Sequence, residues 1–177
     1  IAFNGSENDY QSTIRLDNIN YIMDGKNKFT NVSGKILYKN NIFYTDKNEF
    51  INANYNNKNV SFSLATDNDK NFVVSGSKKI DVSSYIENIS YKNRILGPSL
   101  WNYKLKIPGF NNISKKIKIY ANSDLYKTSV NFPKPFKKEK NIKKNISVNA
   151  FLENNNFSDI SIKYNGIYAE ISSFDNL

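Results

Sequence analysis

Apolar and polar residues alternate along most of this chain. The period-two pattern recurs in the segments 14–16, 60–64, 101–107, 117–119, 130–132, 146–150, 160–162 and 167–171. Because successive side chains of a strand point to opposite faces, this pattern predicts strands with one half-buried face. The chain is therefore predicted to be all-β.

Clusters of Asn, Asp and Gly separate many of these segments and tolerate the positive φ angles of tight hairpin turns. The clusters are Asp24-Gly25, Lys39-Asn40-Asn41, Asn56-Asn57-Lys58, Asp67-Asn68-Asp69, Asn154-Asn155-Asn156 and Asn165-Gly166. No connection resembles the helical crossover of about a dozen residues that parallel strands need. An antiparallel meander follows. One segment, from Ile80 to Asn88, has apolar spacings of three and four and predicts a short helix.

A meander with one apolar face can shield that face in two ways. It can curl into a curved, open, groove-like sheet, or pack against a second sheet as a β-sandwich. Alternation fits both arrangements, so the pattern alone does not choose between them. In the open arrangement the terminal strand edges would pair with neighbouring repeats of a parent chain.

The length of 177 residues fits one domain. No domain boundary is visible, so residues 1–177 are predicted to form a single β-rich segment. The chain begins with Ile1 rather than Met, which favours a piece of a larger protein. No apolar run approaches the roughly 20 residues of a membrane-spanning helix.

Basic residues outnumber acidic ones by 25 to 16, giving a net charge of +9, which favours an anionic partner. The run from residue 134 to residue 144 is predicted to be a loop, either solvated or in contact with an anionic membrane surface. Nucleic acid is not predicted as a partner, because the aromatic residues alternate with polar ones as core positions do. The loop carries six lysines, namely Lys134, Lys137, Lys138, Lys140, Lys143 and Lys144.

The chain has few means of catalysis, since it contains no His and no Cys. It therefore lacks the residue that titrates nearest neutral pH, the best thiolate nucleophile and the commonest transition-metal ligands. Carboxylate pairs such as Asp46 with Glu49 lie in polar turn sequence, where nothing would raise one pKa. We predict no catalytic residue, no metal site and no cofactor, and an enzyme is the least supported function.

Two motifs in the second half carry a family resemblance. Ser123-Asp124-Leu125 opens a strand that leads into Phe132-Pro133-Lys134-Pro135-Phe136-Lys137-Lys138. Upstream lie the glycine-containing segments Val32-Ser33-Gly34-Lys35-Ile36 and Val74-Ser75-Gly76, then Asp81 to Ile86, then Leu96-Gly97 and Trp101-Asn102-Tyr103. In this order they resemble the YhdP family of large AsmA-like, TamB-like envelope proteins of Gram-negative bacteria. Phe132 replaces the usual leucine before the first proline.

The resemblance covers about residues 14 to 171, and its specific element is the stretch from Ser123 to Lys138. It implies a segment of a periplasmic protein that an inner-membrane helix anchors outside this chain. It also implies a long, bent β-sheet whose concave face carries phospholipid acyl chains between the inner and outer membranes.

On this basis we predict a non-enzymatic segment of a phospholipid conduit, in which an apolar lining shields acyl chains. The alternative is a β-sandwich binding or adhesive module for an acidic glycan or another protein, with the same residues forming a closed core. The predicted lining consists of Trp101, Tyr103, Leu105, Ile107, Ile117, Ile119, Val130, Phe132, Ile146, Val148, Ile160, Ile162, Ile167 and Ile171.

Overall fold

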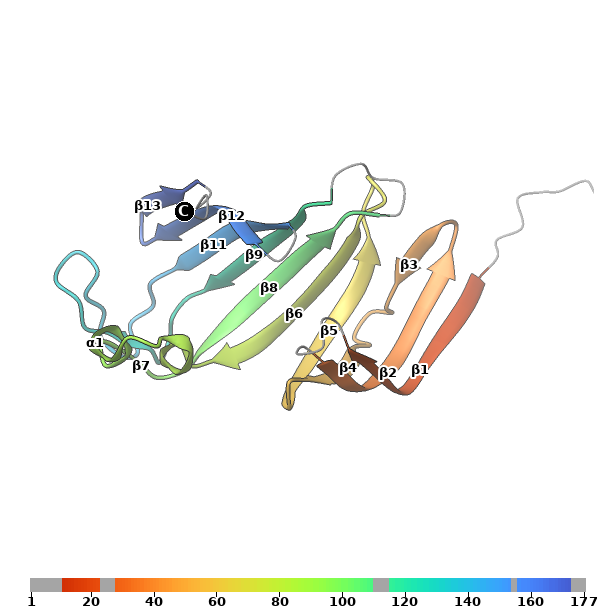
Figure 1. Ribbon diagram of the computed structural model, residues 1–177, viewed down its shortest axis with the longest axis horizontal. Helices are drawn as coiled ribbons and strands as arrows, with labels where there is room; N and C mark the ends of the chain where they lie inside the picture. Colours follow the sequence, from red (N-terminus) through yellow and green to blue (C-terminus); the bar gives the residue numbers. More distant parts are fainter. Residues whose placement is uncertain (1–10, 23–27, 110–114, 154–155, 173–177) are drawn as a thin grey trace, which may run out of the picture. The chain divides into compact units, whose positions relative to one another are not determined.

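The computed structural model describes residues 11–22, 28–109, 115–153 and 156–172. Hydrogen bonds join its strands into an open, mostly antiparallel sheet of eleven strands (Figure 1). The order is β1-β2-β4-β5-β6-β8-β9-β11-β12-β13, with β3 paired to β2, and β7 and β10 form a separate two-stranded sheet. The predicted all-β class with an open sheet is confirmed. The described residues do not form the alternative, a β-sandwich of two packed sheets.

Backbone contacts group the chain into two units, although the sequence shows no boundary. Unit 1 comprises residues 1–74 and 108–112, and unit 2 comprises residues 75–107 and 113–177. The strand β6 (Phe72–Ile80) begins in unit 1 and ends in unit 2. The strands up to this point are β1 (Gln11–Ile22), β2 (Lys28–Lys39), β3 (Ile42–Tyr44), β4 (Ile51–Tyr55), β5 (Lys58–Thr66) and β6 (Phe72–Ile80).

The most buried apolar residues in the described part of unit 1 are Ile51 and Ala53 of β4. In the β4–β5 ladder Ile51 lies opposite Phe62, and Ala53 lies opposite Val60. Gly34 of β2 permits a close approach to β4, because a Cβ at this position would lie 3.0 Å from the Ile51 Cα. The glycine thus serves strand packing in unit 1.

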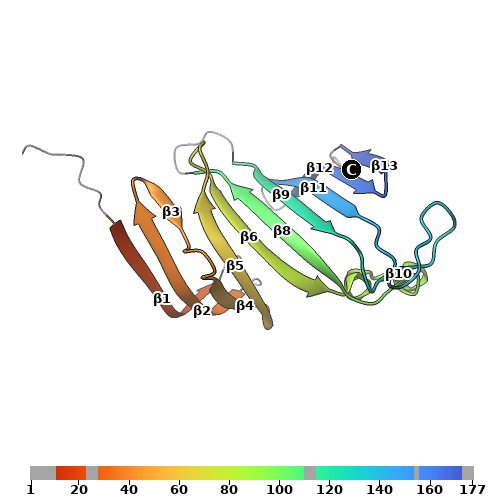
Figure 2. The same cartoon turned by 180° about the vertical axis from the view of Figure 1, so that it is seen from behind.

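Unit 2 contains the second half of the sheet and all the elements outside it. Figures 1 and 2 show β8, β9, β11 and β12 side by side. The elements are η1 (Val82–Tyr85), α1 (Ile89–Lys92), β7 (Ile95–Leu96), β8 (Ser99–Ile107), β9 (Ile117–Ser123), β10 (Ser129–Val130), β11 (Ile146–Glu153), β12 (Asn156–Tyr164) and β13 (Ile167–Ile171).

Of the short helix predicted from Ile80 to Asn88, the structure has only the 3₁₀ turn η1, and the α-helix α1 begins after the predicted segment. Asp81 accepts a hydrogen bond from the Ser83 N–H and caps the 3₁₀ turn η1, whereas Asn88 accepts from the Ser90 N–H and caps α1. Two N-cap residues this close together each start a new turn, so the apolar spacing does not extend into one helix.

Three of the six predicted turn clusters have the expected positive φ angles, whereas at Asp67-Asn68-Asp69 the positive φ occurs one residue later, at Lys70. Positive φ angles occur at Asn40, Asn41, Asn56, Asn57 and Asn165. Asp24-Gly25 and two residues of Asn154-Asn155-Asn156 lie outside the described residues. The turn chemistry therefore fixes several of the hairpins that align the sheet.

Candidate functional site

The strands of unit 2 place apolar side chains in rows across one face of the sheet. Neighbouring strands are antiparallel and in register, so residues directly opposite each other share a face. One such row joins β8 to β13 and consists of Tyr103, Ala121, Val148, Ile162 and Ala169. We call the face that carries this row the apolar face.

Further rows extend the apolar face in both directions along the strands. Every residue of the predicted lining except Val130 and Phe132 lies on this face, and none is buried. Ile171, on the last strand β13, is 39% exposed. The further opposed sets are Leu105 with Ile119 and Ala150, Ile117 with Leu152, Ile146 with Tyr164 and Ile167, and Ile160 with Ile171.

Sequence reasoning left several members of this face out of the predicted lining. Ala121, Leu152, Tyr164 and Ala169 continue the same period-two pattern within their strands. Extending the alternation to small and aromatic residues, and to the last apolar position of β11, would have found them. Burial raises the pKa of the Tyr103 phenol, which is therefore neutral on this face at neutral pH.

Val130 and Phe132 lie away from the sheet that carries the other predicted residues. Val130 belongs to β10 and pairs with Ile95 of β7. The Phe132 ring stacks on Tyr91, with centroids 6.1 Å apart, and lies 5.5 Å from the Arg94 guanidinium carbon. The alternation there spans only two apolar positions before Pro133, and proline ends a ladder because it has no N–H.

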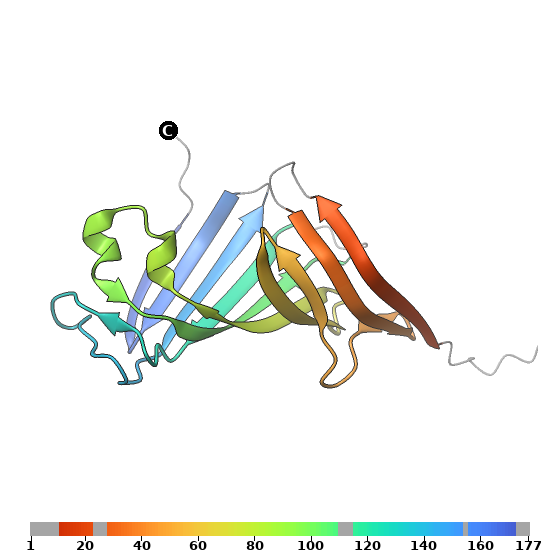
Figure 3. The ribbon, with the colours of Figure 1, turned by 90° about the horizontal axis from the view of Figure 1, so that it is seen from below.

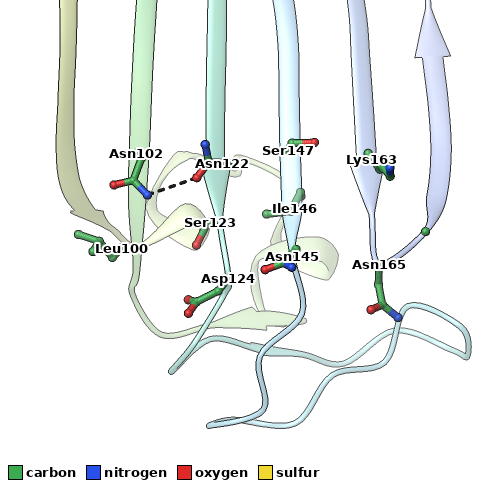
Figure 4. Close-up of a pocket in the computed structure, with 11 residues that line it drawn as sticks. Leu100, Asn102, Asn122, Ser123, Asp124, Asn145, Ile146, Ser147, Lys163 and Asn165 are labelled. Carbon is green, nitrogen blue, oxygen red and sulfur yellow. Dashed lines mark hydrogen bonds between the residues drawn. The ribbon is translucent and has the colours of Figure 1, made fainter.

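The opposite face of the same strands is polar and hollowed at the strand ends (Figure 4). Its cavity has a volume of about 580 Å³. Asn102 accepts a hydrogen bond from the Ser77 hydroxyl at 2.6 Å and donates to Asn122 at 3.2 Å. The ionisable residues of the lining are Asp124 and Lys163. Asp124 is ion-paired with Lys143, whose ammonium is 3.2 Å from the carboxylate.

Loops cover one end of the apolar face. In Figure 3 the turns η1 and α1 (green) and β10 with its following loop (cyan) gather at one end of the unit 2 strands. Ser99, Ser123 and Tyr164 are buried at this end. The Phe136 ring stacks on Tyr164 with centroids 6.2 Å apart, and the Tyr164 hydroxyl donates to the Phe136 carbonyl at 2.9 Å. The loop is thus attached directly to the apolar face.

The Ser123-Asp124-Leu125 motif builds the turn from which this covering begins. The Leu125 N–H donates to Ser123 Oγ and the Tyr126 N–H donates to Asp124 Oδ1, each at 3.0 Å. Leu125 takes a positive φ of 50° and is buried. The Thr128 hydroxyl donates to the Gly97 carbonyl at 3.0 Å. These bonds explain why short polar side chains flank a buried leucine.

Asp124 is held as a carboxylate. Its hydrogen bond from the Tyr126 N–H lowers its pKa below 3.8, with a further contribution from Lys143, whose ammonium is 3.2 Å from the carboxylate, against an opposing effect of burial. A lowered folded-state pKa contributes stability that is present above pH 3.8 and is lost as the pH falls through the folded-state pKa.

We expect Asp124→Asn to flatten the acid side of the stability profile. The amide can still accept from the Tyr126 N–H but carries no charge for Lys143. Urea unfolding midpoints at about pH 3 and about pH 7 should therefore differ less for this variant than for the parent chain. Asp159→Asn, at an exposed position of β12, is the matched control and should keep the parent profile. Equal acid sensitivity of Asp124→Asn and the parent would contradict the assignment.

Three lysines of the loop at residues 134–144, the basic loop, hold it in place. The buried Lys138 ammonium donates to the carbonyls of Thr128 and Glu139, at 2.5 and 3.0 Å. Lys144 donates to the Lys137 carbonyl at 2.8 Å, and Lys143 pairs with Asp124. Of the two alternatives for this loop, the solvated one does not hold for Lys138, because backbone carbonyls replace its water.

Burial lowers the pKa of the Lys138 ammonium. The positive charge of Lys144 adds to this effect, and the negative charge of Asp124 opposes it. The main-chain N–H groups of Val130 and Lys138 also donate to each other's carbonyls. The loop is therefore a defined structure and not a solvated tail.

Comparison of the chain with protein-family models, with curated proteins and with solved structures found no match. Within the described ranges, no group of three or more acidic side chains is placed to hold a metal ion. No helix in the same ranges is long and apolar enough to cross a membrane.

Proposed function

We propose that this chain binds phospholipid acyl chains on the apolar face of unit 2 and shields them from water without chemical change. The observation that carries the proposal is a registered apolar face across five strands with no buried residue among its predicted lining members. A face of this kind is costly to leave in water, so an apolar occupant is expected.

The aliphatic composition of the face supports an acyl chain as that occupant. Ile, Val, Leu and Ala supply most of its surface, and no charged side chain belongs to the opposed rows. Each methylene group removed from water contributes about 0.8 kcal/mol, so a long acyl chain is retained without directional contacts. Without such contacts, it can slide along the face.

The resemblance to the YhdP family supports the wider setting. We propose that the chain is a segment of a periplasmic conduit whose parent protein is anchored in the inner membrane. The strands β1 and β13 stand at the two ends of the hydrogen-bonded order. In the parent chain these edge strands would pair with adjacent repeats.

The direct test is mass spectrometry of the chain purified without detergent, together with uptake of a fluorescent phospholipid. We expect co-purifying phospholipid and saturable uptake that free fatty acid competes away. A lipid-free preparation that takes up no fluorescent phospholipid would overturn the proposal. Binding of acidic glycan by such a preparation would favour the adhesive alternative.

A further inference from the structure

The basic loop lies where the apolar face ends, and this position suggests a second part of the lipid site. Phe136 stacks on Tyr164, a member of the apolar face, and the Lys144 ammonium lies 5.7 Å from the centroid of the same ring. The main chain around Phe136 and Lys137 is therefore adjacent to the rows of apolar side chains. A molecule lying on the face reaches the loop at this end.

The lysines of the basic loop fall into two groups. Lys138, Lys143 and Lys144 are used internally, in bonds to carbonyl groups and to Asp124. The second group is exposed, and within the described residues none of its ammonium groups is paired with a carboxylate. It consists of Lys134, Lys137 and Lys140.

The exposed lysines keep a net positive charge on the loop. Glu139 is the one acidic residue of the loop sequence. Because the internal bonds fix the loop backbone, less conformational entropy is lost when its exposed ammonium groups meet an anion. Phe136 is 45% exposed and Ile142 is 49% exposed, so the same loop also offers apolar contact.

We infer that the basic loop recognises the phosphate headgroup of the lipid whose acyl chains lie on the apolar face. This inference rests on the proposed function and deepens it, because it assigns a headgroup class to the site. In a phospholipid a negatively charged phosphodiester is next to the acyl chains. In this chain the exposed lysines of the basic loop are next to the apolar face, so the two arrangements are complementary. Lysine binds phosphate as a point charge without fixed geometry, so the loop would select for charge more than for headgroup shape.

The test compares two fluorescent probes with identical acyl chains, phosphatidylglycerol and diacylglycerol, which lacks the phosphate. The variant combines Lys134→Gln, Lys137→Gln and Lys140→Gln. A matched control combines Lys79→Gln, Lys104→Gln and Lys163→Gln, which removes the same charge from exposed positions outside the loop. Circular dichroism melting confirms that both variants fold.

The parent chain should bind phosphatidylglycerol more tightly than diacylglycerol. We expect the loop variant to lose about threefold to tenfold in phosphatidylglycerol affinity, because three exposed charge pairs each contribute little. Its diacylglycerol affinity should not change. The control should keep both affinities. The preference should also shrink at high salt, because mobile ions screen exposed charges.

Several outcomes overturn the inference. Equal affinity of the parent chain for the two probes removes the headgroup site but leaves acyl-chain binding intact. An equal loss in the control assigns the preference to net charge. Inorganic phosphate that binds the lipid-free parent as tightly as phosphatidylglycerol does would make the loop a free-phosphate site. Failure of both lipids to bind the parent overturns the proposed function and the inference together.

Discussion

The Leu105→Asp variant is expected to fold and to lose most of its acyl-chain binding. Leu105 lies on β8 between Lys104 and Lys106 in sequence and opposite Ile119 on the apolar face. It is part-exposed, so the new carboxylate reaches water when no lipid is present. Unfolding would require a buried, unpaired carboxylate, which costs several kcal/mol against a total stability of roughly 5–15 kcal/mol.

Lipid binding should fall because an acyl chain on the face removes water from the same carboxylate. A penalty of about 1.4 kcal/mol is a factor of ten in affinity, and the cost of desolvating a charge exceeds this. We expect at least a tenfold loss of phospholipid affinity, measured by fluorescence titration. The thermal midpoint should change by only a few degrees.

Tyr120→Asp is the matched control for Leu105→Asp. Tyr120 lies opposite Lys104 on the polar face and is 40% exposed. Its substitution replaces a large side chain with the same carboxylate as in Leu105→Asp. The control should fold and bind lipid like the parent chain. Unfolding of Leu105→Asp would indicate a covered face, and full lipid binding by that variant would remove Leu105 from the site.

Gly97→Ala is expected to lower the free energy of unfolding by about 2–3 kcal/mol. Gly97 has a φ of 94°, and a Cβ there would lie 2.6 Å from the Lys127 carbonyl oxygen. The turn cannot move away freely, because the Thr128 hydroxyl donates to the Gly97 carbonyl. The variant therefore combines backbone strain with loss of the contact between the segments before β8 and after β9.

Thermal unfolding measures this effect, with a fall of roughly 2–4 °C for each kcal/mol in a chain of this size. Leu96→Ala is the matched control, since Leu96 is 51% exposed and adjacent in sequence. It should lower the midpoint by a degree or two. If the two variants had the same midpoint, the turn at residues 125–128 would not be docked on Gly97.

Alternation predicted the strands of unit 2 well because each strand has one polar and one part-exposed apolar face. It could not predict which residues lie opposite each other, since register depends on partner strands far away in sequence. The shift between Asn149 and Phe151 in the β11–β12 ladder is an example. Asp159 of β12, with a φ of 48°, provides the irregular backbone for it.

The loop chemistry was less accessible from the sequence than the strands. Six lysines in one run have the same composition whether they face water or carbonyl groups, so the burial of Lys138 depends on contacts with Thr128 and Glu139. The positive φ of Leu125 was equally hidden, because a branched side chain rarely adopts it. The resemblance singled out the stretch from Ser123 to Lys138, but the hydrogen bonds that form its turn are visible only in the structure.

The small size of the buried set has a consequence for how this sequence can vary. The most enclosed side chains are Thr128 and Ser99, and both lie at the covered end of the strands. The part-exposed positions of the apolar face require an apolar side chain but no particular shape, unlike Tyr164, on which Phe136 stacks. Mutational drift can therefore exchange Ile, Val and Leu along the strands at little cost. Within unit 2, steric selection is strongest at Gly97, Ser123, Leu125 and Thr128, so we expect the sequence of this turn to vary more slowly than the sequence of the strands.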